Sequence, residues 1–250
     1  MDFPFSYDLT AYEWMLVILG GMLIGMSKTG LSGAGLFVVP LFAGIFGGKP
    51  SAGLVLPMLI VADFFAVKYY NRHAEWKYVW KLLPWAFAGI LLAVFVGERI
   101  NDRQFRMLIA VIVMTGIVLM VLQDIRRQKV EGPDYWWFAA LLGLGGGFAT
   151  MIGNAAGPIL SLYLLSMRLP KNIYIGTAAW FFFIVNLSKV PLHIFIWETI
   201  SWQSLSFNLL MVIPIVSGAI SGFYLVKLFP EKAYRIFIIA STLAAAFMLF

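Results

Sequence analysis

Apolar residues fill ten runs of the chain, and short polar segments separate these runs. Within the runs Leu, Ile, Phe, Ala and Gly follow one another without the alternation of period two that marks the strands of a membrane β-barrel. The pattern therefore predicts an all-α, polytopic helical membrane protein. The runs cover residues 14–26, 31–47, 51–70, 78–97, 107–122, 135–152, 155–167, 172–196, 205–226 and 235–250.

Two of the runs are too short to cross a bilayer. Residues 14–26 and 155–167 hold thirteen residues each, which is about 20 Å of helix against a hydrocarbon core of about 30 Å. A Gly-rich segment joins each of them to a neighbouring run, over residues 25–35 and over residues 143–158. We therefore expect a broken or re-entrant helix pair at both places.

The two halves of the chain resemble each other. A shift of 123 positions aligns the two Gly-rich breaks, and after an insertion of six residues the shift becomes 129. We therefore expect residues 1–130 and 131–250 to be homologous repeats within one integral membrane domain. The matched pairs are Gly30 with Gly153, Leu41 with Leu164, Gly53 with Gly176, Asp63 with Asn186, Gly89 with Gly218 and Arg106 with Arg235.

The charges of matching loops differ between the halves. The loop Asn71–Lys81 carries three basic residues, whereas its equivalent, Phe195–Ser204, carries none and one acid. Cytoplasmic loops are enriched in Lys and Arg, so these two loops are expected on opposite faces of the membrane. The halves are then inverted copies with both termini outside the cytoplasm. The basic residues of segment 98–106 fall on the outer face and do not fit this pattern.

Composition agrees with a lipid-facing chain. Hydrophobic residues make up 62% of the 250 residues and charged residues 12%, about half the charged share of a soluble protein. The net charge of +6 lies in short clusters rather than in blocks, so no nucleic-acid partner is expected. Cysteine is absent, which excludes disulfides and thiolate chemistry. We expect a multi-pass protein of a bacterial or archaeal cell membrane, with lipid as its surroundings.

Inverted repeats with interrupted helices in matching positions are typical of secondary transporters. Backbone inside the membrane leaves helical form only where protein or water satisfies its polar groups. Two breaks at matching depths therefore predict a shared polar cavity between the halves. The N-terminal ends of half-helices that face such a cavity favour an anionic substrate, because they present free N–H groups and a positive dipole end.

The first break carries the first candidate ligands. Lys28 is flanked by Thr29, and Ser32 and Gly33 follow; we expect this group to bind the anion. The alternative is that Lys28 lies at an ordinary cytoplasmic turn. In the second break, Asn154 can donate to an oxyanion, or it can be a plain helix cap.

Glycines in both breaks permit close approach of a substrate to the backbone. Gly157 is the candidate for this role in the second break, next to Asn154. Close helix crossings in membranes also use glycine, so the Gly-rich pattern has a structural explanation as well.

Three polar residues lie inside other runs. Asp63 is an acid deep in an apolar run, where function is the default hypothesis; it is the candidate for proton coupling, and an ion pair with Lys68 is the alternative. Asn186 and Lys189 share a helix face, and together they are expected to form a second wall of the anion site. Alternatively, Lys189 neutralises Asp63 across the repeat interface.

Aromatic and histidine residues are expected at the membrane interfaces. His193 lies close to the outer end of its run, and an interfacial position is favoured over a proton role. Trp197 and Trp202, like the other tryptophan and tyrosine clusters, are expected to anchor the protein at the headgroups.

The run Gly30–Leu41, GLSGAGLFVVPL, resembles the signature of the sulfite exporter TauE/SafE family. The resemblance extends to the length of the chain, the duplicated halves, the basic central loop and the second Gly-rich break. It implies a permease for a small sulfur-containing anion such as sulfite, sulfoacetate or another organosulfonate, with the proton as a possible coupling ion.

Two other functions are compatible with parts of the sequence. An anion channel with the same inverted architecture has the same sequence pattern. A rhomboid-type intramembrane serine protease would use the Gly-x-Ser-Gly of Gly30–Gly33 with His193 as its base, but these lie far apart in the sequence. No enzyme activity, cofactor or metal site is expected, because the two histidines are isolated and no nucleotide motif is present.

Overall fold

The computed structural model describes residues 7–29, 34–125, 135–167 and 169–228. Its described part is helical and contains no strand, which confirms the all-α prediction. The α-helices are α1 (Ala11–Thr29), α2 (Ala34–Phe46), α3 (Gly48–Tyr70), α4 (Trp76–Gly97), α5 (Asp102–Ile125), α6 (Trp136–Gly153), α7 (Gly157–Ser166), α8 (Lys171–Phe195) and α9 (Trp202–Leu228), and a 3-10 turn, η1, covers Asn71–His73. The last apolar run, 235–250, lies outside the described residues.

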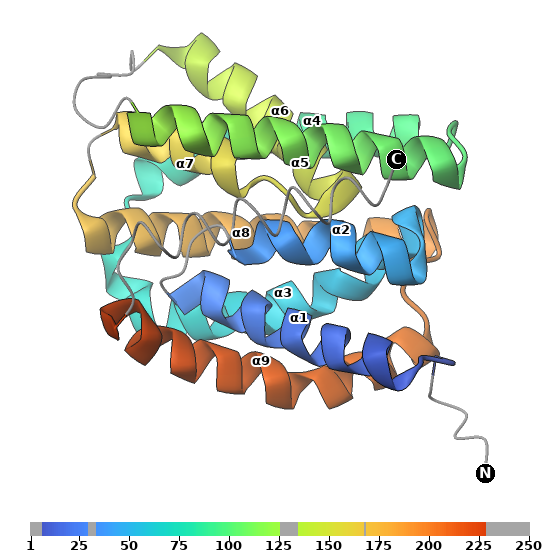
Figure 1. The fold of residues 1–250 in the computed structure, drawn as a ribbon. Helices are drawn as coiled ribbons and strands as arrows, with labels where there is room; N and C mark the ends of the chain where they lie inside the picture. Colours follow the sequence, from blue (N-terminus) through green and yellow to red (C-terminus); the bar gives the residue numbers. More distant parts are fainter. Residues whose placement is uncertain (1–6, 30–33, 126–134, 168, 229–250) are drawn as a thin grey trace.

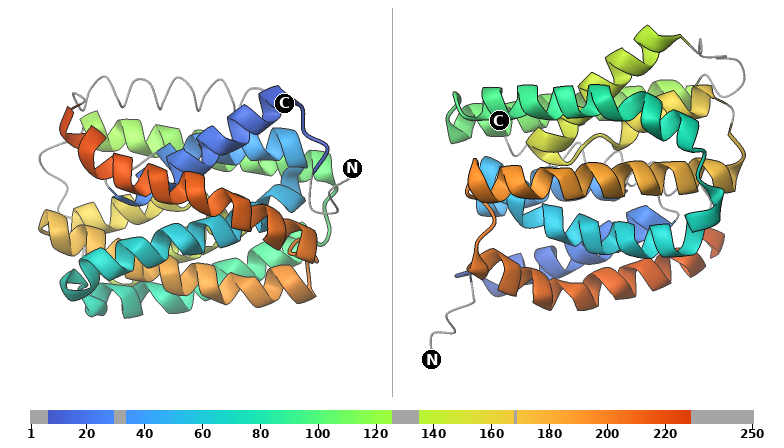
Figure 2. Two further views of the ribbon diagram at one scale, coloured as in Figure 1. Left: turned by 90° about the horizontal axis from the view of Figure 1, so that it is seen from below. Right: turned by 180° about the vertical axis from the view of Figure 1, so that it is seen from behind.

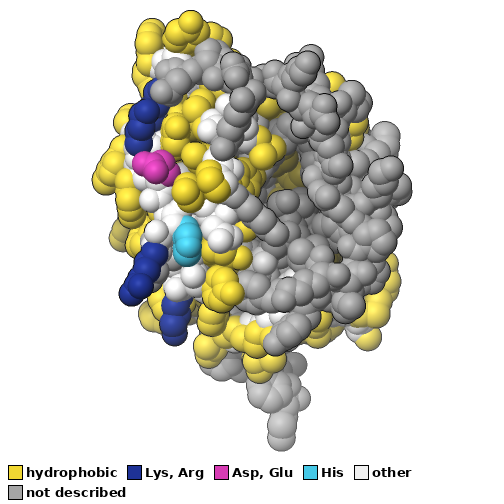
Figure 3. Space-filling model, turned by 90° about the vertical axis from the view of Figure 1, so that its left-hand side faces the viewer, with side chains coloured by type: hydrophobic (Ala, Val, Ile, Leu, Met, Phe, Trp, Pro, Cys, Tyr) yellow, Lys and Arg dark blue, Asp and Glu magenta, His cyan; other side chains and the backbone are white. Residues whose placement is uncertain are grey.

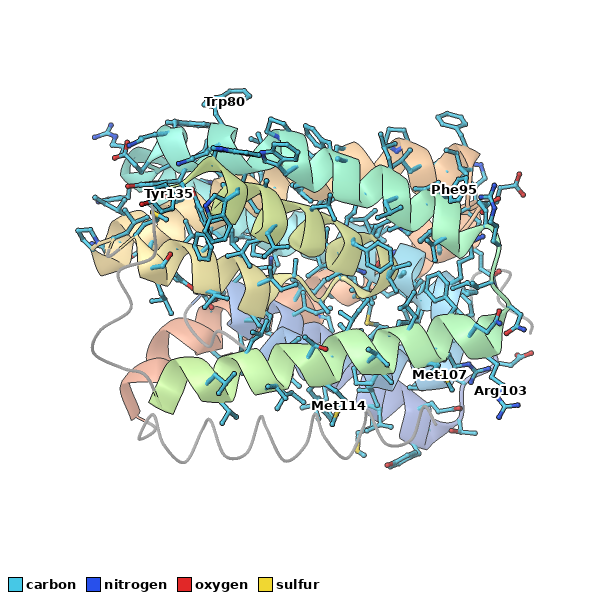
Figure 4. All side chains as sticks on the ribbon, turned by 90° about the horizontal axis from the view of Figure 1, so that it is seen from above. Trp80, Phe95, Arg103, Met107, Met114 and Tyr135 are labelled. Carbon is cyan, nitrogen blue, oxygen red and sulfur yellow. The ribbon has the colours of Figure 1, made fainter. Side chains whose placement is uncertain are left out.

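Five helices of the described residues are long and apolar enough to cross a membrane: α3, α4, α6, α8 and α9. The 23 residues of α3 give about 35 Å of helix, enough for a hydrocarbon core of about 30 Å. Large apolar side chains point outward from the bundle, and Figure 4 shows Trp80 and Phe95 doing so along α4; they are 64% and 56% exposed. An apolar outer surface fits lipid and not water.

The first short run was predicted wrongly, because α1 has 19 residues and begins at Ala11. Thr10 and Glu13 start it early: the Thr10 N–H donates to Glu13 Oε2 over 2.8 Å, and the Glu13 N–H donates to Thr10 Oγ1 over 3.3 Å. This reciprocal capping draws polar residues into the helix. The second short run, 155–167, was predicted correctly, because it holds the ten-residue helix α7. The other short helix of the described chain is α2, with 13 residues.

The second break is described and interrupts the helix as predicted. α6 ends at Gly153, and Asn154 follows in the left-handed conformation with φ 55°. The Asn154 N–H donates to the carbonyl oxygen of Thr150 over 3.0 Å, which closes the helix end in an αL turn. At the first break, residues 30–33 lie outside the described residues.

The helices form two groups with α8 between them (Figure 1). One group contains α4, α5, α6 and α7, and its core includes Leu82, Phe105 and Tyr163. The other contains α1, α3 and α9, and its core includes Ile24 and Phe207. Figure 2 shows α8 lying between α4 and α3. Because α4 packs on α6 and α9 packs on α1, helices from residues 1–130 and 131–250 interlock.

The helices α3 and α8 pack side by side in opposite directions. Thr199, just after the end of α8, lies against Gly53 near the start of α3. His73, just after the end of α3, lies against Gly176 near the start of α8. A side chain at either glycine would collide with its neighbour. The loops that follow the two helices are therefore at opposite ends of the bundle.

Glycines also make the closest contacts between helices of the two halves. A Cβ at Gly89 of α4 would collide with the carbonyl oxygen of Leu144 in α6, and a Cβ at Gly218 of α9 would collide with that of Met22 in α1. Small residues allow backbones to approach in this way in membranes. Gly89 and Gly218 are the pair that the shift of 129 matched in the sequence.

Candidate functional site

The polar centre of the bundle is an ion pair between two helices of the first half. Lys28 Nζ, in the last turn of α1, lies 2.7 Å from Asp63 Oδ1 in α3. The Asp63 side chain is 0% exposed and that of Lys28 is 15% exposed. Asp63 therefore forms its ion pair with Lys28. The two alternatives drawn from the sequence, a pair with Lys68 and a pair with Lys189, were wrong.

The second half supplies the other groups around this pair. Asn186 Nδ2 of α8 donates to Asp63 Oδ2 over 2.6 Å. Lys28 Nζ also lies 4.2 Å from the centroid of the Phe182 ring of α8, a cation–π distance. Among the described residues, Asn186 Oδ1 has no hydrogen-bond partner although it is buried. The site thus joins side chains from both halves of the chain.

Lys189 forms hydrogen bonds with the C-terminal end of α6 and not with the Asp63 carboxylate. Its Nζ donates to the carbonyl oxygen of Thr150 over 2.9 Å, to Thr150 Oγ1 over 3.0 Å and to Asn154 Oδ1 over 2.7 Å. An ammonium group has three donors, so these contacts occupy all of them. A cation is stabilised here because a helix C-terminus carries partial negative charge.

Asn154 connects three helices. It ends α6, accepts the hydrogen bond from Lys189 of α8, and donates from Nδ2 to the carbonyl oxygen of Ala52 in α3 over 3.0 Å. Its side-chain oxygen and its amide are therefore both engaged within the protein. The left-handed φ of 55° suits this residue, because Asn adopts that conformation more readily than other side chains.

The remaining predicted ligands lie in different places. The hydroxyl of Thr29 donates within α1, to the carbonyl oxygens of Gly25 and Met26, and packs against Gly222 of α9, away from the ion pair. Gly157 opens α7, and no described atom lies within 4 Å of the place where its Cβ would stand. Ser32 and Gly33 lie outside the described residues.

Basic side chains outnumber acidic ones in the described interior. Lys28 and Lys189 bring two amino groups there, and Asp63 brings one carboxyl group. No cluster of three or more metal-ligating side chains occurs in the described part of the chain. An uncompensated charge in a membrane interior is costly, and an anion bound near Lys28 would balance it.

Two residues differ from the sequence-based expectation of interfacial positions. His193 is 0% exposed, and Trp197 is 5% exposed. Trp202, in contrast, is 85% exposed, as expected for an anchor at the membrane surface. The apolar run around His193 gave no signal for its burial, because the contact that covers it comes from the following loop: Thr199 Oγ1 lies 2.7 Å from His193 Nδ1.

Basic side chains gather at the end of the bundle that carries η1. Figure 3 looks onto this end and shows Lys and Arg side chains spaced among hydrophobic ones. Arg72 in η1 and Lys77 in the first turn of α4 are exposed. This is the end that the charge pattern predicts to be cytoplasmic.

Comparison with known proteins gives one family. Residues 17–249 match the family described as Sulfite exporter TauE/SafE. No curated protein and no solved structure matches the chain. Members of the family are transporters and not enzymes, which removes the intramembrane protease from consideration. Because the match covers nearly the whole chain, this multi-pass protein of the cell membrane belongs to the sulfite exporter TauE/SafE family of membrane transporters.

Proposed function

We propose that the chain carries a small sulfur-containing anion, sulfite or an organosulfonate, together with a proton, through a site at Lys28 between its two halves. The observation that carries this proposal is the excess of basic over acidic side chains at the buried centre of the described residues, with Lys28 and Lys189 against Asp63. An anion that binds there removes the excess positive charge from a medium of low dielectric constant.

Lys28 is the group that contacts the anion. Unlike Lys189, whose three donors are all engaged, Lys28 has one ionic partner and a side chain that is still 15% exposed. The aromatic face of Phe182 on its other side keeps the ammonium partly desolvated. Asn154 and Lys189 act as positioning residues, because they fix the end of α6 and its connection to α7.

Asp63 couples the proton to the anion by competition for Lys28. While Asp63 is ionised, its carboxylate neutralises Lys28 over 2.7 Å. When a proton binds to Asp63, Lys28 is released and attracts the anion. Binding of the two ligands is then cooperative, and each raises the affinity for the other by the same factor.

The inverted repeat is part of this proposal. Two contacts have the same form in opposite halves. Near the start of α3, Gly53 lies against Thr199, and near the start of α8, Gly176 lies against His73. The opposite directions of α3 and α8 support a two-fold axis in the membrane plane between the halves. Alternating access then follows when one group of helices moves against the other around a fixed site.

The proposal is tested by anion binding to purified protein. Isothermal titration with sulfite, sulfoacetate, taurine, sulfate and acetate is carried out on the native chain, on Lys28→Ala and on Lys68→Ala, which removes an exposed lysine of α3. We expect Lys28→Ala to lower the affinity for the preferred anion by tenfold or more, about 1.4 kcal/mol. Lys68→Ala is expected to bind that anion with native affinity. Native affinity in Lys28→Ala would remove Lys28 from the site.

A carrier and a channel are separated by flux measurements. In proteoliposomes a carrier shows saturable uptake that is accelerated by unlabelled substrate on the opposite side. We expect both properties with radiolabelled sulfite. Uptake that rises linearly with concentration and shows no such acceleration would favour the anion channel.

A further inference from the structure

A buried polar stripe leaves the candidate site along α8. Asn186, Lys189 and His193 are spaced by three and four residues and therefore share one face of the helix. Their exposed fractions are 1%, 0% and 0%. Asn186 and Lys189 belong to the site, whereas His193 lies one turn further towards the α8–α9 loop. The stripe therefore leads from the site towards that end of the bundle.

Unpartnered polar atoms continue along this stripe. His193 Nδ1 lies 2.7 Å from Thr199 Oγ1, but within the described chain its Nε2 has no partner. The same holds for Nε1 of Trp197, one turn beyond. Buried polar atoms are normally paired, and leaving one unpaired costs about 1–3 kcal/mol. Polar groups held at this cost indicate a place where a polar ligand or water passes.

The indole of Trp197 closes the stripe. Its ring centroid lies 5.1 Å from that of His193 and 5.5 Å from that of Phe105 in α5, both edge to face. Lys49 Nζ of α3 lies 5.3 Å from its centroid. The ring packs so closely on α4 that a Cβ at Gly97 would be 2.5 Å from it.

The backbone beside Trp197 is unusual. Glu198 has φ 51°, and besides Asn154 it is the only non-glycine residue of the described chain with a positive φ. This conformation is costly for a side chain such as Glu and is maintained only where the surroundings require it. Of the two left-handed positions, Asn154 next to the site suits its residue type, and the strained one is Glu198 in the turn that holds Trp197.

A surface cavity lies next to two of the residues that contact this ring. It has a volume of about 430 Å³, and its walls include Lys49 and Phe105, both of which contact Trp197. The Lys49 ammonium is paired with Glu98 over 2.7 Å. From the cavity inward, the order is Phe105, Trp197, His193 and then the Lys189 cluster.

We infer that this line is one half of the translocation path and that Trp197 is the plug that closes it in the present conformation. The polar atoms of His193 and Trp197 then hydrogen-bond to the passing anion or its water once the indole swings away. The identity of the anion rests on the proposed function, but the position of the path does not. The charge pattern predicts that this half opens to the outside of the cell.

Accessibility of a single cysteine tests the plug. The chain contains no cysteine, so His193→Cys is a unique reporter immediately inside Trp197. A membrane-impermeant, negatively charged thiosulfonate reagent is applied to right-side-out and to inside-out vesicles, and the labelling rate is measured. Trp197→Ala is expected to raise the rate tenfold or more from the side of the α8–α9 loop only. Trp197→Phe, which keeps a ring in place, is expected to label as slowly as the parent.

A second variant and a control reporter separate opening from loss of structure. Gly97→Ala leaves Trp197 intact but pushes its indole out of place, so it is also expected to accelerate labelling. Ala110→Cys, at a fully buried position of α5, is expected to stay unlabelled in every background. An unchanged rate in both Trp197→Ala and Gly97→Ala, labelling from the opposite side, or equal acceleration at Ala110→Cys would overturn the inference. The assay contains no substrate, so it stands or fails independently of anion binding at Lys28.

Discussion

Asn186 donates a 2.6 Å hydrogen bond to Asp63, the residue that lies 123 positions before it. This is the same shift that aligns the two halves in the sequence, so the proposed duplication makes the contact one between equivalent residues of α3 and α8. The proposed inverted repeat would place such a contact on its two-fold axis. One of the two positions carries an acid and the other an amide, which leaves a single carboxylate in this pair, with Lys28 as its partner.

Removal of Lys28 is expected to destabilise the protein through Asp63. In Lys28→Ala the buried carboxylate loses its counter-ion, and such a loss costs about 3–5 kcal/mol. Thermal unfolding in detergent at neutral pH would therefore show a lower midpoint than in the native chain. The double variant Lys28→Ala/Asp63→Asn removes both charges and is expected to recover most of the stability without recovering transport. A double variant that is no more stable than Lys28→Ala would show that the pair is not coupled.

Lys189 is expected to matter for stability through the end of α6. Lys189→Met leaves Thr150 Oγ1 and Asn154 Oδ1 without the donor that they share, and each unsatisfied buried group costs about 1–3 kcal/mol. The unfolding midpoint is expected to fall by several degrees, and Lys68→Met is the matched exposed control. In a double-mutant cycle of Lys189→Met with Asn154→Ala, the losses of unfolding free energy are expected to be less than additive. Full additivity would mean that the contact carries no energy.

Two glycines of α6 provide a matched pair for helix packing. A Cβ at Gly147 would collide with the backbone of Ala86 in α4, whereas a Cβ at Gly145 meets no described atom within 4 Å. Gly147→Ala is expected to destabilise by about 1–3 kcal/mol, as is typical of overpacking. Gly145→Ala is expected to be neutral or slightly stabilising. Equal unfolding midpoints for the two variants would show that α4 and α6 are not in close contact.

The opposite directions of α3 and α8 predict opposite locations for the loops that follow them. Glu75 and Gln203 are both exposed, one beside η1 and the other at the start of α9. An impermeant thiol reagent is expected to label Glu75→Cys only from the cytoplasmic side and Gln203→Cys only from the outside. Labelling of both from one side would contradict the inverted arrangement.

The helices could be predicted from the sequence because apolar runs report burial in lipid directly. The predicted helix ends were less accurate where polar residues continue a helix. At the start of α1 these residues are Thr10 and Glu13, and at its end they are Lys28 and Thr29. Hydropathy counts such residues as breaks, although side-chain hydrogen bonds to the helix keep them in it. The first short helix was therefore placed at α1, one segment before α2, whereas the second, predicted at residues 155–167, coincides with α7.

The polar residues of the site were identified from their depth in apolar runs, but their partners were not. Depth singled out Lys28, Asp63 and Lys189, because a lipid-facing helix does not hold such charges. Which of them pair depends on how α1, α3, α6 and α8 cross, and no local pattern contains that information. The burial of Trp197 was missed for the same reason, since Phe105 and Gly97, which cover it, are distant in the sequence.

Proton movement during anion transport tests the role of Lys28 and Asp63 most directly. Proteoliposomes that contain a pH-sensitive dye receive an inward gradient of the preferred anion, with protein-free liposomes as the control for passive permeation. The native chain is expected to move protons with the anion. Asp63→Asn keeps a side chain that can hydrogen-bond to Asn186 but cannot take up a proton. This variant is expected to exchange anions and to move protons about tenfold more slowly or less, because coupling free energies between two sites are typically about 1–3 kcal/mol, or factors of about 5–150. Unchanged proton-coupled transport by Asp63→Asn would contradict the proposal.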